Sequence, residues 1–284
     1  MKKPESDINS SVTNGINRTI IYTDLDGTLL DPYDYSFAEA KPLVSKLQNQ
    51  GTAIVFCSSK TRAEQEVYQK ELDIHDPFII ENGSAIYIKQ GYFSSPFDYQ
   101  RISDQYYVIE LGIRYELIRE KINEIRERNN LAFSGYGDMD SSEVARHTGL
   151  DAVSAKLAKQ REYEETLNLN GTEPDIKLIL KAIESSGLKW NRGSRFYSVS
   201  GNGDKGKAAK ILTSLFEREF GKVKTIGIGD SYNDIPMLRE VDCPILVQKP
   251  GDIWEKTELK NMHYANGVGP HGWIRAITEF TGIK

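Results

Sequence analysis

Short apolar runs rich in β-branched and aromatic residues alternate with amphipathic stretches in the first third of the chain. Each run ends at a polar residue, and the runs cover residues 19–23, 52–57 and 78–80. The stretch at 37–50 has apolar residues at helical spacing and stops at Gly51, and a second helix is expected after residues 58–61. The order strand, helix, strand, helix, strand predicts a parallel sheet with crossover helices.

This rhythm is lost in the middle of the chain and returns after Gly201. In the middle part we expect strands at 107–111, 131–135 and 195–199, helices at 114–129, 141–148, 151–160 and 174–186, and a polar run at 161–165. After Gly201 a helix at 207–220 precedes an apolar strand at 223–228. We therefore predict an α/β fold. A core with a Rossmann-like parallel sheet, residues 18–89 and 201–284, is interrupted by an inserted α+β unit at 90–200.

Composition supports an ordinary globular protein, because 39% of the 284 residues are hydrophobic and 27% are charged. Residues 1–17 are polar and have no apolar segment, which predicts a disordered N-terminal tail rather than a signal peptide. No run of 18 apolar residues occurs, so no membrane partner is expected. We therefore expect a cytoplasmic protein. The sequence gives no indication of the oligomeric state.

Charge and cysteine content exclude two further classes of site. The formal net charge of −5 argues against a nucleic-acid partner, which would require clustered positive charge. Cys57 and Cys243 are far apart and lack a CxxC or Cys/His pattern, so neither a disulfide framework nor a zinc site is expected. Both thiols are expected to be buried as small apolar groups.

The strongest candidate chemistry lies at residues 24–28, Asp-Leu-Asp-Gly-Thr, directly after the first apolar run. The carboxyl ends of parallel strands are where ligands bind in open α/β sheets. A carboxylate can attack phosphorus to give an aspartyl-phosphate, and a second carboxyl can protonate the leaving oxygen and later deprotonate water. We assign Asp24 as the nucleophile and Asp26 as the acid/base. Taken separately, the motif is also typical of a simple turn.

A second acidic loop, Gly-Asp-Ser-Tyr-Asn-Asp at 229–234, follows the apolar run that ends at Ile228. Attack by Asp24 on a phosphoryl group requires a hard cation to screen the negative oxygens, and this role suits Mg²⁺. The expected metal ligands are Asp24, Asp26, Asp230 and Asp234. Ser58 and Lys205 are expected to hold the phosphate, although a serine before a helix is more often an N-cap and a lone lysine more often solvated.

These four segments occur in the order of the four motifs of the haloacid dehalogenase superfamily, and the chain is identified as resembling its members. They are Asp-Leu-Asp-Gly-Thr at 24–28, Ser58, Asp-Lys-Gly at 204–206 and Gly-Asp-Ser-Tyr-Asn-Asp at 229–234. The resemblance implies that residues 90–200 form a cap of the larger α+β kind (C2B-like). With an aspartate at position 26, the first motif resembles that of phosphatases and mutases, whereas transport ATPases have Asp-Lys-Thr-Gly-Thr at this motif.

A closer resemblance is to the mannosyl-3-phosphoglycerate phosphatase family. It rests on segments at 29–31, 35–37, 59–64, 81–86, 158–162, 192–197 and 269–273. It implies hydrolysis of mannosyl-3-phosphoglycerate, with the glucosyl compound as an alternative, to the glycosylglycerate and phosphate during compatible-solute synthesis. Independently, the arginines exceed what one phosphate needs, and arginine suits bidentate carboxylate recognition. The expected substrate-binding residues are Lys60, Arg62, Asn82, Gly83, Arg161, Arg192 and Arg195.

Three alternatives remain open at this point. A sucrose-phosphate type phosphatase or a phosphomannomutase would use a similar core and cap. An NAD(P)-binding oxidoreductase would use the GxGxxG at 201–206, with Asp230 at the next strand end, but it leaves Asp24 and Asp26 unexplained. A catalytically silent relative would be expected to lack one of the motif residues, and all are present.

Overall fold

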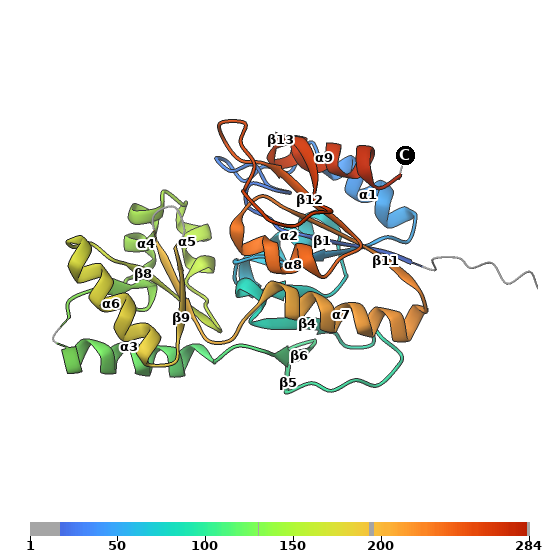
Figure 1. Cartoon of the computed structure of the whole chain (residues 1–284). Helices are drawn as coiled ribbons and strands as arrows, with labels where there is room; N and C mark the ends of the chain where they lie inside the picture. Colours follow the sequence, from blue (N-terminus) through green and yellow to red (C-terminus); the bar gives the residue numbers. More distant parts are fainter. Residues whose placement is uncertain (1–17, 130, 193–195, 283–284) are drawn as a thin grey trace, which may run out of the picture.

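The central element of the molecule is a five-stranded parallel sheet (Figure 1). The computed structural model describes residues 18–129, 131–192 and 196–282. The strand order is β13-β12-β11-β1-β2, with bounds His263–Val268, Cys243–Gln248, Val223–Gly229, Arg18–Thr23 and Ala53–Phe56. The predicted tail at 1–17 lies outside the described residues. β1, the first predicted strand, lies between β11 and β2.

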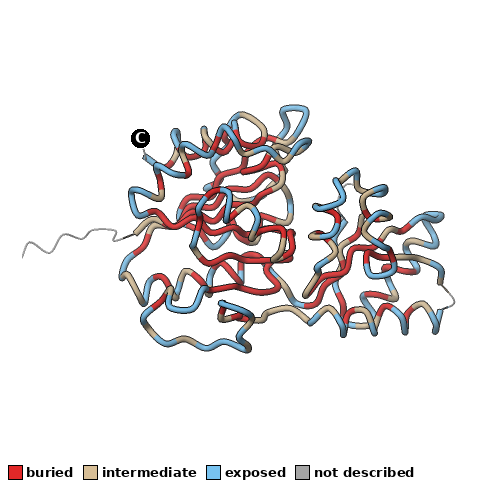
Figure 2. The backbone as a smooth tube through the Cα atoms, turned by 180° about the vertical axis from the view of Figure 1, so that it is seen from behind, coloured by how far each residue is buried: buried red, intermediate tan, exposed pale blue. Residues whose placement is uncertain are grey.

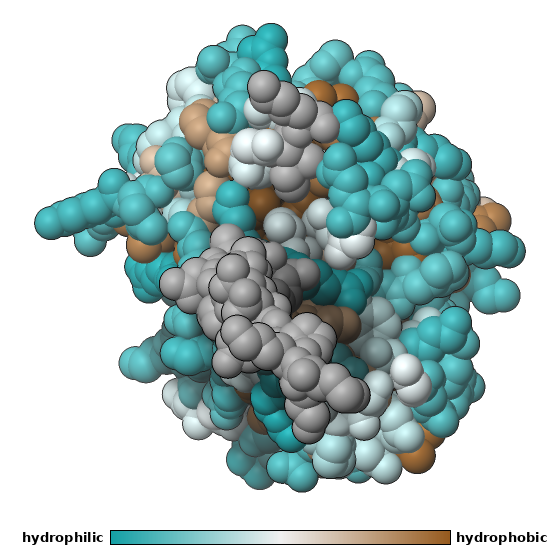
Figure 3. Space-filling view, turned by 90° about the vertical axis from the view of Figure 1, so that its right-hand side faces the viewer, coloured by the Kyte–Doolittle hydropathy of each residue, from teal (hydrophilic) through white to brown (hydrophobic). Residues whose placement is uncertain are grey.

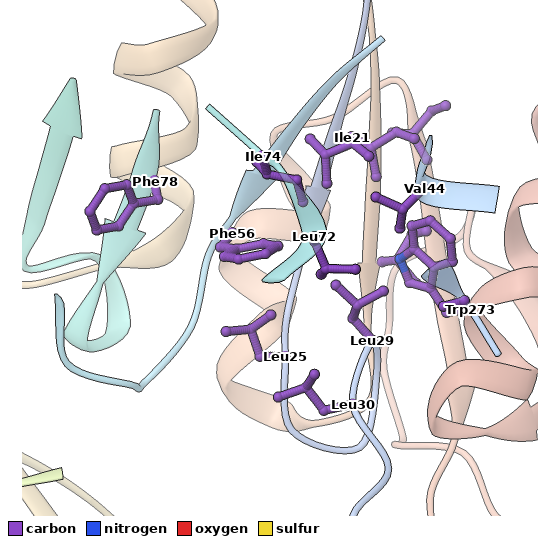
Figure 4. Close-up of a cluster of buried hydrophobic side chains, with 14 of the residues drawn as sticks. Ile21, Leu25, Leu29, Leu30, Val44, Phe56, Leu72, Ile74, Phe78 and Trp273 are labelled. Carbon is purple, nitrogen blue, oxygen red and sulfur yellow. The ribbon is translucent and has the colours of Figure 1, made fainter. Parts of the chain in front are cut away.

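Helices cover both faces of this sheet because successive side chains of each strand point to opposite sides. One face carries α1 (Lys41–Asn49), α2 (Arg62–Leu72) and α9 (Gly269–Phe280), and the other carries α7 (Lys205–Phe220) and α8 (Ile235–Arg239). Accordingly, Ile21 packs in the first layer with Val44 and Trp273 (Figure 4), whereas Ile20 and Tyr22 pack with α7. Figure 2 shows four strands of this sheet, β1, β2, β11 and β12, buried over most of their length, whereas the edge strand β13 is largely exposed or half-buried.

A second, antiparallel sheet adjoins the core. Its order is β3-β4-β6-β5, with bounds Phe78–Ile80, Ala85–Lys89, Tyr106–Glu110 and Arg101–Ser103. The prediction of β3 as a third parallel strand was wrong except for a single parallel bridge between Cys57 and Ile79. The reason is the short 3₁₀ turn η1 (Glu81–Gly83), where Glu81, Asn82 and Gly83 all have positive φ and return the chain antiparallel as β4.

The inserted unit has its own sheet and its own core, as the α+β prediction requires. Its antiparallel sheet β7-β8-β10-β9 spans Ser134–Gly135, Glu164–Asn168, Tyr197–Ser200 and Lys189–Arg192. It is covered by α3 (Tyr115–Asn129) and α6 (Glu173–Ser185), and η2 (Tyr136–Asp138), α4 (Ser141–Thr148) and α5 (Ala152–Ala158) complete it. Figure 1 shows this unit beside the core, and we call it the cap.

The pairing of β5 and β6 bears on where the cap begins. Both strands pair within the sheet of β4, and Tyr106 and Val108 pack in the same cluster as Phe78 of the core. We therefore propose that the cap begins between β6 and α3 rather than at the predicted residue 90. The polar run at 161–165 likewise contains the start of β8, which the sequence analysis did not predict.

The outer surface of the core is polar. Figure 3 shows mainly hydrophilic side chains on the side of the core away from the cap, with hydrophobic positions scattered among them. Within the described ranges, no helix combines the length and apolar character needed to cross a membrane.

Candidate active site

The acidic loops meet at the carboxyl ends of neighbouring strands. β1 starts on the side of the core away from the cap, so its carboxyl end is the end nearer the cap (Figure 1). Asp24 follows β1, Ser58 lies just after β2, and Asp230 follows β11. The amide of Asp24 donates to the carbonyl of Ile228 at 2.9 Å, which fixes the two loops side by side. This is the edge of a parallel sheet where a ligand is expected.

Three of the four predicted acidic residues form one buried cluster. Asp24, Asp230 and Asp234 each offer a carboxylate oxygen, and these oxygens lie within 4.8 Å of one another. Asp234 is oriented by the amides of Asp230 and Ser231, which donate to its Oδ2 at 3.1 and 3.0 Å. Gly27 is required here, because a Cβ at this position would lie 2.9 Å from Oδ2 of Asp230 and its φ is +76°.

Lys205 supplies the positive charge of the cluster. It stands at the start of α7, its side chain is 1% exposed, and its Nζ donates to Oδ1 of Asp24 and of Asp234, each at 2.7 Å. Burial would lower the pKa of Lys205, but Asp234 and Asp24 outweigh this effect and raise it. The residue therefore remains an ammonium, which is the form that can accompany a phosphoryl group.

One ammonium does not balance three carboxyl groups. Burial raises the pKa of Asp24, and Asp234 raises it further. The pKa of Asp230 is raised to about 7, again mainly by burial and then by Asp234. A cluster of oxygen donors whose charged forms repel one another suits a hard divalent cation, because such a cation stabilises the ionised carboxylates.

Asp26 lies apart from this cluster. Its side chain is 41% exposed, and its Oδ1 is 3.0 Å from Nζ of Lys60. Lys60 also pairs with Glu64 at 3.5 Å and lies 4.8 Å from the ring centre of Tyr35. The structure therefore brings Lys60, expected to bind substrate, to the expected acid/base residue, and it does not bring the carboxylate of Asp26 to the other three acids.

Ser58 is fully buried next to the nucleophile loop. Its amide donates to the carbonyl of Ile79 at 3.2 Å, and its Oγ accepts from the amide of Lys60 at 3.3 Å. The serine thus occupies the predicted strand end. Within the described part of the chain no hydrogen bond uses this hydroxyl as a donor, so its proton is available for an acceptor such as a phosphate oxygen.

Two predicted substrate-binding arginines instead join the cap to the core. Arg62 pairs with Glu162 at 3.1 Å and with Asp104 at 2.6 Å. Arg161 donates to the carbonyl of Ser59 at 2.8 Å and lies 4.0 Å from Glu164. Both guanidinium groups are therefore engaged by protein partners, and the sequence could not show these partners.

The predicted pair Asn82 and Gly83 has a similar connecting role. Nδ2 of Asn82 donates to both carboxylate oxygens of Glu164 in the cap, at 3.1 and 3.0 Å, and its Oδ1 accepts from Asn233 of the second acidic loop at 3.1 Å. At Gly83 a Cβ would lie 2.2–2.4 Å from backbone atoms of Asp204 and Lys205. The two residues thus contact the segments that carry Asp234 and Lys205.

The remaining cap residue, Arg192, lines an open cleft of about 730 Å³ between the cap and the core. Trp190 and Ser198 line it from the cap, and Asn233 and Lys249 from the core. Arg195 lies outside the described residues.

The sequence of this chain is similar to those of known hydrolases. A family model described as haloacid dehalogenase-like hydrolase matches residues 21–250. The chain belongs to this hydrolase family. It is 43% identical over 264 residues to the glucosyl-3-phosphoglycerate/mannosyl-3-phosphoglycerate phosphatase of Methanococcoides burtonii, covering 93% of this chain and 97% of that protein. It is 44% identical over 232 residues to the mannosyl-3-phosphoglycerate phosphatase of Pyrococcus horikoshii, covering 80% and 90%.

A solved structure from Thermoplasma acidophilum shares the fold of this hydrolase, with a TM-score of 0.64 and 15% identity over 93% of this chain and 99% of that one. The predicted superfamily and the α/β fold are therefore confirmed.

The structure also gives a physical reason to set aside the dinucleotide-binding alternative in this hydrolase. β10, which precedes the GxGxxG segment, belongs to the antiparallel sheet of the cap, so the parallel βαβ unit of a dinucleotide site does not occur there. Packing explains each glycine, because added Cβ atoms would meet Ile113 at Gly201, Ser84 at Gly203 and the carbonyl of Pro236 at Gly206.

The sequence analysis of this hydrolase missed three residues around the site. Glu81 accepts the amides of Glu162 and Tyr163 from the cap, each at 2.9 Å, and no sequence pattern indicated this contact. Asn233 was noted only as a member of the second acidic loop, without a role of its own. Lys249 directly follows β12, and the apolar run at 243–247 was a signal that could have identified another strand end at the site.

Proposed function

We propose that this hydrolase is a Mg²⁺-dependent phosphatase that converts mannosyl-3-phosphoglycerate and glucosyl-3-phosphoglycerate to the glycosylglycerate and phosphate, in the cytoplasm, as a step in compatible-solute synthesis. The observation that carries the proposal is the buried contact of Lys205 with Asp24 and Asp234, beside Asp230. The substrate is proposed because relatives at 43% and 44% identity bear these names.

In the proposed mechanism a carboxylate oxygen of Asp24 attacks phosphorus while the bond from phosphorus to the ester oxygen breaks. Asp26 gives its proton to that departing oxygen, which leaves as the alcohol of the glycosylglycerate. Asp26 then removes a proton from water, the water oxygen attacks phosphorus, and the bond to Asp24 breaks to release phosphate. Asp26 is suited to this exchange because its side chain is 41% exposed and outside the buried cluster.

Lys205 and Ser58 hold the phosphoryl oxygens by charge and by a hydroxyl donor in the same scheme. Asp24, Asp230 and Asp234 would hold Mg²⁺, which screens the negative charge of the phosphoryl group when it is bound. The all-oxygen donor set and the raised pKa of Asp230, about 7, support this assignment.

The test is a substrate panel with two matched variants. The panel compares kcat/KM for mannosyl-3-phosphoglycerate, glucosyl-3-phosphoglycerate, mannose phosphates and sucrose phosphate, with and without a chelator. We expect the two glycosylphosphoglycerates to be preferred and chelation to abolish phosphate release. Asp24→Asn should remove activity with the circular dichroism spectrum retained, whereas Asp31→Asn, on an exposed turn, should not. Full activity of Asp24→Asn would refute the nucleophile assignment, and preference for sucrose phosphate would refute the substrate.

A further inference from the structure

The cleft between cap and core contains a cation that the proposed chemistry does not use. Lys249 directly follows β12, and its side chain is 30% exposed. Of the described residues that line this cleft, Arg192 from the cap and Lys249 from the core are its positive charges. Lys205 serves the phosphoryl group from a buried position elsewhere. A second anionic group of a ligand in the cleft would therefore meet Lys249 on the core side.

Lys249 is held in place rather than free in solvent. Its Nζ lies 2.7 Å from Oε2 of Glu255, whose other oxygen accepts the amide of Lys256 at 3.0 Å. Glu255 also receives a backbone hydrogen bond from Tyr232 of the second acidic loop, and Lys249 is the main cause of the lowered pKa of Glu255. The carboxylate thus fixes the lysine relative to the acidic loop. An ammonium has three donors, and Glu255 occupies one.

Lys249 and the second acidic loop face the same cleft. Ser231 and Tyr232, which follow the metal-binding candidate Asp230, line the same cleft as Lys249. A ligand whose phosphate lies at Asp24 could therefore extend past Ser231 toward Lys249.

We propose that Lys249, positioned by Glu255, binds a carboxylate that the substrate carries beside its phosphate ester. This inference rests on the proposed function, because glycosylphosphoglycerates contain such a carboxylate. It assigns Lys249 to recognition and not to the chemical step. An ammonium is a compact charge that binds a carboxylate without requiring the planar geometry of arginine.

The experiment compares two small substrates that differ only in the carboxylate, namely 3-phosphoglycerate and glycerol 3-phosphate, together with mannosyl-3-phosphoglycerate. For Lys249→Met we expect kcat/KM to fall about 10- to 100-fold on the two carboxylate substrates, because a hydrogen bond to a charged group is lost. The change should lie mainly in KM, since the contact is made equally in the ground state and the transition state. Glycerol 3-phosphate should change less than about 3-fold.

Two further variants separate recognition from general effects of charge. Lys260→Met removes the same charge from an exposed position outside the cleft and should leave the ratio between the two small substrates unchanged. Lys249→Arg retains the charge and should restore most of the carboxylate preference.

The outcomes distinguish this inference from the proposed function. Equal losses on 3-phosphoglycerate and glycerol 3-phosphate would overturn the role of Lys249, while turnover of mannosyl-3-phosphoglycerate would still support the phosphatase. A selective loss in a protein that prefers a different phosphorylated acid would support Lys249 and overturn the proposed substrate. A wild-type protein without any preference for 3-phosphoglycerate over glycerol 3-phosphate has no carboxylate site, and the inference then fails.

Discussion

We expect Lys205 to contribute to folding as well as to the proposed chemistry of the site. Its ammonium lies between two buried carboxylates, 2.7 Å from each. Lys205→Met leaves these carboxylates facing each other, and removing one partner of a buried ion pair costs about 3–5 kcal/mol. We therefore expect the free energy of unfolding without Mg²⁺ to fall by about this amount, and added Mg²⁺ to recover part of it. Urea unfolding with and without Mg²⁺ measures both effects, and unchanged stability would contradict the assigned pairing.

Gly83 shows how a backbone contact can control the same lysine. A Cβ at Gly83 would lie 2.2–2.4 Å from backbone atoms of Asp204 and Lys205, and φ is +87°. Gly83→Ala should therefore lower the free energy of unfolding by more than about 2 kcal/mol and reduce kcat.

Gly91→Ala is the matched control, because φ is +79° but nothing lies within 4 Å of the added Cβ. It should cost about 1 kcal/mol and leave kcat unchanged. If both variants lose a similar amount of stability, the positive φ alone explains the effect at Gly83, and the close contact with Asp204 and Lys205 does not.

The sequence could predict side chains placed by their own strand and not those placed by distant partners. Asp24 and Asp230 follow apolar runs, so their location at the sheet edge follows from local pattern alone. Arg62 and Arg161 were predicted from charge, but a charge in the sequence does not reveal its partner. Their partners, Glu162 and the carbonyl of Ser59, come from segments about 100 positions away, as set by the fold.

The same distinction applies to whole elements. The buried strands β1, β2 and β11 were predicted because both of their faces are apolar. β8 was missed because it begins with two glutamates that are nonetheless buried. Glu165 is buried against Tyr115 and Arg119 of α3, and Glu164 against Asn82 of the core. A strand that buries charge on partners from other elements gives no hydrophobic pattern.

Asp138 is an element-level test of charge pairing inside the cap, at a position that is itself exposed. Burial alone would raise its pKa, but hydrogen bonds from Arg119 and Arg126 and from the amide of Gly135 outweigh this and hold the pKa well below its usual range. Because the native pKa lies below the unfolded value, the stabilisation exists above about pH 4 and is lost as the pH falls further. Asp138→Asn should lower the free energy of unfolding at pH 7 by about 0.5–1.5 kcal/mol, because solvent screens the charge of an exposed carboxylate.

The measurement for Asp138 is urea unfolding of both proteins from pH 7 down to about pH 3. The difference between them should be constant at neutral pH and should narrow below about pH 4, where the Asp138 carboxylate of the unfolded wild-type chain begins to take up a proton and the native one does not. A difference that grows in acid would mean that the native pKa is raised instead.

At the scale of the whole molecule, the contacts between cap and core converge on one segment of the cap. Residues 161–164 bind the core through Arg161, the amides of Glu162 and Tyr163, and the side chain of Glu164. On the core side the residues of η1 bind this segment and also touch the segments that carry Lys205 and Asn233. The residues of η1 therefore contact both the cap and the segments that carry Lys205 and Asn233, so a change in η1 is expected to affect both.

Glu81 provides the most direct test of this connection. Its carboxylate accepts the amides of Glu162 and Tyr163, both at 2.9 Å, in a fully buried position. Glu81→Ala leaves two buried amides unpaired, at a cost of about 1–3 kcal/mol each, so this segment should open more often. We expect faster hydrogen exchange at these two amides.

In the same Glu81→Ala variant we also expect a larger loss of kcat/KM on a glycosylphosphoglycerate, which is large enough to reach the cap, than on a small aryl phosphate. Glu143→Ala is the control, because Glu143 likewise accepts a backbone amide, from Asp140, at the start of the cap helix α4. If exchange at Glu162 and Tyr163 rises equally in both variants, general loosening of the cap explains the effect, and η1 does not connect the cap to the active site.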